Sequence, residues 1–104
     1  MELGISTDPT PERYTVRVAG EVDISNAKSL RDAIDLALEQ PTDEVVLDLV
    51  EVSYIDSTGI GVLVGAAHHA ADRQRGFSVV NAQPGVMRVV QLLGVDKEIS
   101  VTAA

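Results

Sequence analysis

The side chains best suited to chemistry lie where an apolar run meets a helical pattern, and they read Asp56-Ser57-Thr58-Gly59 followed by Gly61. Ligands of open α/β sheets gather where strands end, and a helix start presents free N–H groups and a partial positive charge. A hydroxyl at such a junction is therefore well placed to carry a phosphate. The two glycines would let another protein's backbone or a nucleotide approach it closely.

Simpler and catalytic interpretations of the same segment can be set beside this one. Asp56, Ser57 or Thr58 could merely cap the helix, which contributes about 1 kcal/mol, with the glycines serving packing. Asp56 could also orient or activate the Ser57 hydroxyl. A serine hydrolase elbow would read Gly-x-Ser-x-Gly, but Ile55 takes the first glycine's place, and a phosphate-binding loop needs a Lys that is missing here. We therefore expect no catalytic residue.

The histidines do not supply a base for Ser57. His68 and His69 follow it by 11 and 12 residues on the same predicted helix. At about 1.5 Å per residue, His68 would lie roughly 17 Å from Ser57, too far for a base and its nucleophile. Both histidines are expected at the surface.

A second polar loop precedes the first predicted helix. Its residues Asp23, Ser25 and Asn26 are all types that cap helices. The sequence leaves open which of them does so. It also leaves open whether the apolar residues Ile24 and Ile60 are contact residues or core.

Composition limits the partners. The 104 residues include 8 Lys plus Arg against 16 Asp plus Glu, and the net charge of −8 repels a phosphate backbone, so no direct nucleic-acid partner is expected. No apolar run approaches the ~20 residues that cross a bilayer, and Met1–Thr10 lacks the features of an export signal. Because Cys is absent, no disulfide or thiolate site can form. We expect a cytoplasmic location, no membrane contact, no metal and no cofactor.

Periodicity and turn residues predict strands linked mostly through helices, which favours parallel pairing. The expected strands lie at Leu3–Thr7, Tyr14–Ala19 (ended by Gly20), Val45–Val50, Phe77–Asn81 and near Ile99–Val101. The expected helices run from Ala27 to about Gln40, from near Ser57 to Gly76, and from Pro84 to Gly94. Asp48, inside the apolar strand, is expected to be a satisfied, partly buried carboxylate.

The run 56–61, Asp-Ser-Thr-Gly-Ile-Gly, resembles the Asp-Ser-Ser/Thr-Gly-Leu-Gly signature of the STAS domain family, the sulfate-transporter and anti-sigma-factor-antagonist domains. The run 20–23, Gly-Glu-Val-Asp, is similar to the family's Gly-Glu-Leu-Asp element, and Gly94 stands at a family-like spacing. The resemblance covers essentially the whole chain. It implies one α/β STAS domain over residues 1–104, with a mixed sheet of four to five strands and three to four helices.

In size and in its intact run 56–59, the chain is most similar to the free-standing bacterial antagonists of anti-sigma factors. That resemblance implies that the unphosphorylated protein binds an anti-sigma factor that is also a serine kinase, and so releases a sigma factor. Phosphorylation of Ser57 would abolish binding until a serine phosphatase removes the group. The partner-binding residues implied are Asp23, Ser25, Asp56, Thr58, Gly59 and Gly61. The alternative is a constitutive STAS scaffold subunit of a stress-signalling or lipid-transport complex.

Overall fold

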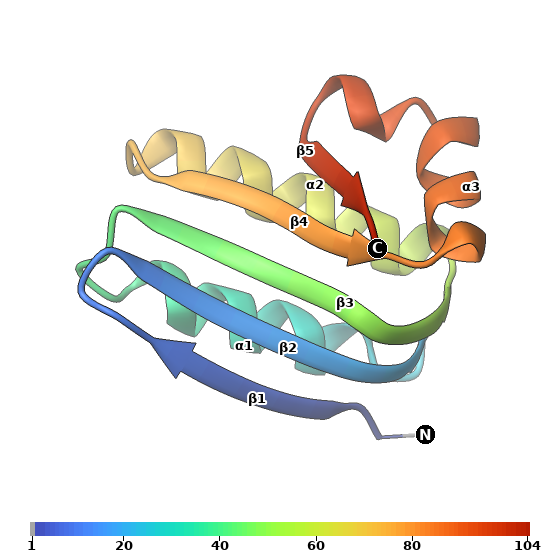
Figure 1. Ribbon diagram of the computed structural model, residues 1–104, viewed down its shortest axis with the longest axis horizontal. Helices are drawn as coiled ribbons and strands as arrows, with labels where there is room; N and C mark the ends of the chain where they lie inside the picture. The colour runs from blue at the N-terminus through green and yellow to red at the C-terminus, as the bar shows by residue number, and fades with distance from the viewer. Residues whose placement is uncertain (1) are drawn as a thin grey trace.

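The computed structural model describes residues 2–104 and is drawn in Figure 1. Within them, the chain forms five strands, three α-helices and one short 3-10 helix, η1. In chain order the elements are β1 Gly4–Pro9, β2 Arg13–Val22, α1 Ala27–Leu38, β3 Glu44–Ile55, α2 Ser57–Asp72, β4 Gly76–Ala82, α3 Pro84–Leu92, η1 Val95–Lys97 and β5 Ser100–Ala103. The predicted α/β architecture is confirmed.

The strands form a single sheet in the order β1-β2-β3-β4-β5. β1 pairs antiparallel with β2, and the other neighbours pair in parallel, as expected for strands joined through helices. The carboxyl ends of β2, β3 and β4 therefore share one edge of the sheet, at the right of Figure 1. Both polar loops singled out in the sequence follow strands that end at this edge.

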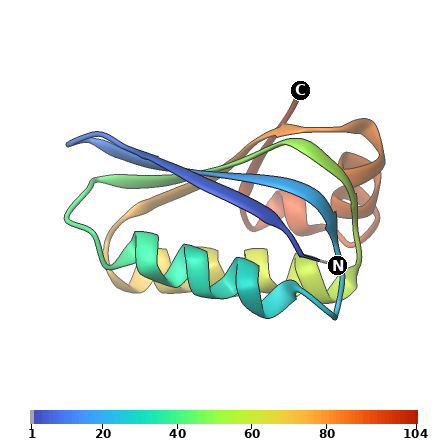
Figure 2. The same ribbon diagram turned by 90° about the horizontal axis from the view of Figure 1, so that it is seen from below.

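The core lies between one face of the sheet and the helices. Figure 2 shows α1 and α2 beneath the sheet, and no helix of residues 2–104 covers the opposite face. Five apolar residues of α1, spaced as on one helix face, are buried: Ala27, Leu30, Ile34, Ala37 and Leu38. The facing side chains of the sheet are mainly aliphatic, among them Val16, Val18, Val45, Leu47, Leu49 and Val79. Aliphatic packing of this kind suits a chain with few aromatic residues.

β2 and β3 run further past their predicted ends than the other strands do. Gly20 does not end β2, because its φ of +122° lets the strand kink there, and the pairing register with β3 shifts just after it. β3 continues past Val50 to Ile55, although polar residues break its apolar run. These extensions carry both strands to the edge at which the polar loops begin.

The predicted end of the second helix at Gly76 is wrong. α2 stops at Asp72, and Gln74 takes a left-handed conformation with a φ of 57° that turns the chain into β4. Gly76 is already the first residue of that strand. The prediction that the third helix ends at Gly94 is confirmed to within two residues, since α3 stops at Leu92 and Gly94 has a left-handed φ of 69° just after it.

Asp48 is satisfied on the uncovered face of the sheet, as expected. Its Oδ1 accepts hydrogen bonds from the Val50 amide at 3.0 Å and from Asn81 Nδ2 at 3.1 Å. Arg17 Nε lies 3.8 Å from its Oδ2. These partners stabilise the sheet where the pairing of β3 with β4 ends.

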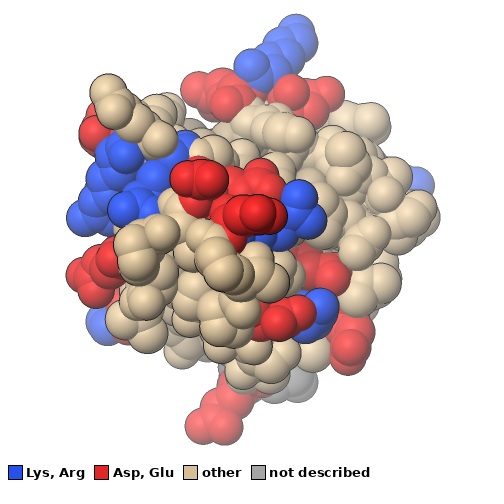
Figure 3. Space-filling model, turned by 60° about the vertical axis from the view of Figure 1, so that its left-hand side comes forward, with Lys and Arg blue, Asp and Glu red and all other residues tan. Residues whose placement is uncertain are grey.

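The end of the molecule opposite the polar loops carries charges of both signs, as Figure 3 shows. Arg13 and Glu44 pair there at 2.6 Å, across the starts of β2 and β3. Arg75 donates to the carbonyls of Gln40 and Thr42 and so ties the loop after α1 to the start of β4. These contacts are structural, and no sequence-predicted site residue lies among them.

Candidate functional site

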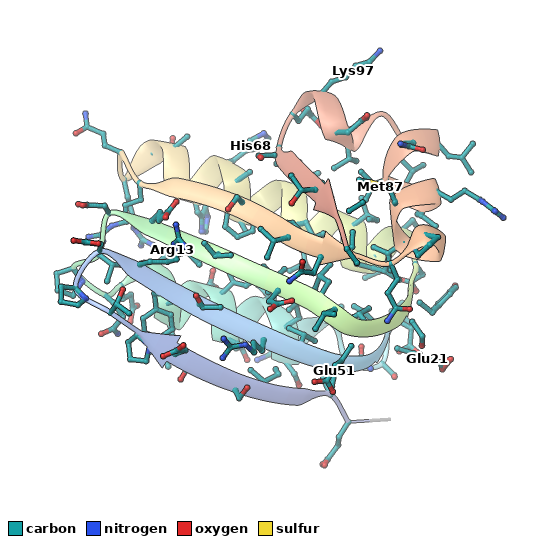
Figure 4. All side chains as sticks on the ribbon, viewed as in Figure 1. Arg13, Glu21, Glu51, His68, Met87 and Lys97 are labelled. Carbon is teal, nitrogen blue, oxygen red and sulfur yellow. The ribbon has the colours of Figure 1, made fainter. Side chains whose placement is uncertain are left out.

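The two polar loops lie side by side where β2 and β3 end. The Asp56 amide donates to the Val22 carbonyl at 3.1 Å, so the loop after β2 is bound to the start of α2. Figure 4 labels Glu21 and Glu51, which lie toward this end of the molecule, whereas Arg13 lies toward the other. The segments 20–23 and 56–61, separated in sequence, thus form one surface.

Asp56 caps α2. Its backbone is extended, with φ −96° and ψ −178°, and its Oδ1 accepts a hydrogen bond from the Gly59 amide at 2.9 Å. This is the N-cap arrangement that satisfies one of the free amides at a helix start. The capping interpretation of Asp56 is therefore confirmed, and one of its oxygens is committed to the helix.

Ser57 and Thr58 are the first two residues of α2, and both are exposed. Among residues 2–104, the Ser57 hydroxyl donates to no protein group and accepts from none, so nothing in the fold holds it. It stands at the positive end of the α2 dipole, which stabilises an anion. The arrangement presents a free hydroxyl on a rigid helix start.

The two glycines that follow play different parts. Gly59 is buried, and a Cβ placed on it would lie 2.6 Å from Ile55 Cγ1 and 2.7 Å from Val22 Cγ1. Its missing side chain lets the start of α2 sit directly on the ends of β2 and β3. Gly61 is exposed, and a Cβ there would meet nothing within 4 Å. Packing thus explains why residue 59 must be glycine, but it gives no reason for glycine at position 61.

The loop after β2 is held by its own side chains. Asp23 Oδ1 accepts from both the amide and the hydroxyl of Ser25. Asn26 is buried and bridges the loop: its Oδ1 accepts from the Asp23 amide at 2.9 Å, and its Nδ2 donates to the Glu21 carbonyl at 2.8 Å. None of the three expected caps bonds a helix amide through its side chain; Asn26 occupies the cap position without doing so.

Hydrogen bonding from Ser25, first from its hydroxyl and then from its amide, lowers the pKa of Asp23 below its usual value of 3.8. Asp23 is therefore ionised at neutral pH and adds to the acidity around Ser57.

Ile24 stands at the tip of this loop and is 79% exposed, whereas Ile60 is buried at 3%. The question that the sequence left open is thus answered in opposite ways for the two residues. The side chains of Asp23, Ser25 and Asn26 bond within the loop, so Ile24 is the large apolar side chain that this loop exposes to solvent. In the sequence, only the position of Ile24 directly after Asp23, in a polar loop, favoured its exposure.

A groove of about 480 Å³ runs between α1 and α2 and begins beside the site. It is lined by Thr58, Gly61 and Gly65 from α2, and Arg31 from α1 lies in its wall. Sequence reasoning missed Arg31 and Gly65. The spacing of Gly65, four residues after Gly61, places both on one helix face and could have revealed it.

The two histidines, the remaining candidate residues, form no second functional site. His68 and His69 are exposed, as predicted, and His69 Nδ1 lies 3.8 Å from Asp35 Oδ1 at the far end of the groove. Residues 2–104 contain no cluster of three His, Asp or Glu side chains that could hold a metal ion. No helix in that range is long and apolar enough to cross a membrane.

Comparison with known proteins agrees with this geometry. Residues 5–102 match the family described as "Mlab, STAS domain". An anti-sigma-B factor antagonist of Staphylococcus epidermidis is 28% identical over 94 residues, which cover 90% of this chain and 87% of the relative.

Two solved structures share the fold. That of an anti-sigma factor antagonist from Mycobacterium paratuberculosis has a TM-score of 0.87 and 25% identity, covering 98% of this chain and 86% of the other. The anti-sigma factor antagonist SpoIIAA in its unphosphorylated form has a TM-score of 0.78 over 94% of this chain and 87% of the other; at 22% identity this likeness shows the fold alone. With nearly its whole length matched, the chain belongs to the STAS domain family.

Proposed function

We propose that this protein is an anti-sigma factor antagonist controlled by phosphorylation of Ser57. In the unphosphorylated state it binds an anti-sigma factor that is a serine kinase, and the sigma factor held by that kinase is released. The phosphorylated state does not bind, and a serine phosphatase restores it. Relatives named as anti-sigma factor antagonists, matched over nearly the whole chain, support this function.

The observation that carries the proposal is the state of the Ser57 hydroxyl. It is exposed, it has no hydrogen-bond partner within residues 2–104, and it stands on a helix start fixed by the Asp56 cap. A kinase could reach it without unfolding any part of the domain. The Asp23 loop, bound to the same helix start through the Val22 carbonyl, would form the second half of the partner surface.

Phosphorylation would change the charge of this surface far more than its shape. A phosphate adds roughly −1.5 to −2 charges beside Asp56 and Asp23, on a protein whose net charge is already −8. The helix start would stabilise the phosphate by about 0.3–1 kcal/mol, so the fold should tolerate it. A partner carboxylate facing Ser57 would be repelled at a cost that can reach several kcal/mol.

The same geometry gives no support to a catalytic role. A hydrolase would need a base close to Ser57, yet both histidines lie more than ten residues further along α2. We place the protein in the cytoplasm, where a kinase, its ATP and a sigma factor are all available.

A second candidate is a STAS subunit that binds its partner constitutively. The matching family carries the description "Mlab, STAS domain" rather than that of an anti-sigma factor antagonist, which favours this alternative. In such a scaffold Ser57 would be only a helix residue, and no kinase would modify it.

Intact-mass spectrometry with fragment mapping separates the two candidates. The wild-type protein and Ser57→Ala are each incubated with ATP and every anti-sigma factor kinase encoded in the source genome. One added phosphate on Ser57, absent from the Ala variant, would support the switch. No phosphate from any active kinase would leave the constitutive scaffold as the better account.

A further inference from the structure

Two glycines inside α2 have no explanation in the fold. Neither Gly61 nor Gly65 has a positive φ, and a Cβ on either would meet no atom within 4 Å. Glycine in the middle of a helix is less stable than alanine, because it loses more conformational freedom on folding. The domain would therefore be more stable with side chains at both positions, in contrast to Gly59.

The space that these glycines leave is the groove between α1 and α2. Thr58, Gly61, Gly65 and His69 follow one another along its α2 side at spacings of three and four residues. The eleven residue steps from Thr58 to His69 give the groove a length of about 17 Å, or three helical turns. Its floor is apolar and includes the buried side chain of Ile34.

The α1 wall carries an exposed cation, Arg31. Arg31 is exposed and makes no ion pair or side-chain hydrogen bond within residues 2–104, although the protein has twice as many acidic as basic residues. Asp35, one turn further along, faces His69 at 3.8 Å and marks the far end of the groove. Asp35 thus has His69 beside it, and Arg31 is the charged side chain of the groove that has no ion pair among residues 2–104.

We propose that this groove receives an α-helix of the anti-sigma factor partner. Small side chains on that helix lie against Gly61 and Gly65, and one of its carboxylates pairs with Arg31. This inference rests on the function proposed above, and the groove is continuous with its site: Thr58, at the groove's start, directly follows Ser57. A helix whose backbone approaches this closely is a common mode of recognition, and a methyl group in its path is enough to hinder it.

The test fills the groove without disturbing the domain. Gly61→Leu and Gly65→Leu place side chains in the groove, and Ala71→Leu, at an exposed position of α2 outside the groove, is the matched control. Binding to each anti-sigma factor kinase of the source genome is measured by isothermal titration calorimetry, with thermal unfolding followed by circular dichroism. We expect both groove variants to bind about thirtyfold more weakly or worse, the control to bind like wild type, and all three to fold.

The charged contact is tested in the same assay. Arg31→Gln should weaken binding about tenfold and reduce its dependence on salt, whereas Arg88→Gln, the same change on α3, should do neither. If the wild-type protein binds a kinase and is phosphorylated on Ser57, but both groove variants bind with wild-type affinity, the proposal that the groove receives a helix is wrong. The proposed function would then still stand. Failure of the wild-type protein to bind any kinase would overturn both.

Discussion

The glycines of α2 allow one stability prediction to be worked out in detail. In Gly59→Ala the new methyl group would lie 2.6 and 2.7 Å from carbons of Ile55 and Val22, both fully buried, so side chains or helix must shift. Overpacking of this kind costs about 1–3 kcal/mol, and the gain from replacing a helical glycine is at most about 1 kcal/mol. We expect a net loss of about 1–2 kcal/mol.

The same substitution at Gly61 should have the opposite sign. Its methyl group meets no atom within 4 Å, so only the gain of about 0.5–1 kcal/mol remains. For a domain of about 100 residues the two variants should differ in Tm by roughly 10 °C. Urea unfolding followed by circular dichroism measures both free energies, with Gly65→Ala as a second open position. Equal stability of Gly59→Ala and wild type, or a loss in Gly61→Ala, would refute the packing argument.

Three further predictions concern the site. Ser57→Asp should fold like wild type and fail to bind the anti-sigma factor, whereas Ser57→Ala should bind and resist inactivation by ATP; wild-type binding by the acidic variant would contradict the switch. Ile24→Ala should lower affinity about tenfold or more without loss of stability, and Leu36→Ala, an exposed change on α1, should not; calorimetry compares them. Ser25→Ala should raise the pKa of Asp23 toward 3.8 in a carbon-detected NMR titration. Because that pKa is lowered in the folded state, the turn's contribution to stability is present above pH 3.8 and is lost as the pH falls through the folded value. An unchanged pKa would show that the Ser25 hydroxyl is not the main cause.

The main features of the fold could be predicted because they depend on local patterns. Residues 27–38 repeat their apolar positions at helical spacing, and Pro84 begins α3 while Gly94 follows it, as helix start and stop rules predict. The ends of β2 and β3 could not be predicted. Beyond Gly20 the two strands stay paired after a shift in register, and this pairing keeps the chain extended although both segments contain polar residues. Single-sequence patterns do not contain that pairing.

The segment that carries the site could be predicted from the sequence, whereas the surface that it forms with the Asp23 loop could not. The run 56–61 was identified from its residues, and the structure shows its capping Asp56 and exposed Ser57. Which glycine packs and which lies open depends on Val22, distant in sequence, so spacing alone could not distinguish them. Likewise, residue type makes each of Asp23, Ser25 and Asn26 a possible helix cap, but their side chains bond one another and the loop backbone instead.

The close fit of Gly59 against the ends of two strands also limits how the protein can convey its state. A helix start seated this tightly has little freedom to move when its first residue gains a phosphate. The signal would then be stored as charge on an unchanged backbone and would be read only when another molecule makes contact. A reporter built from this domain should accordingly monitor association between two labelled proteins, since a pair of fluorophores within the single chain would register almost nothing.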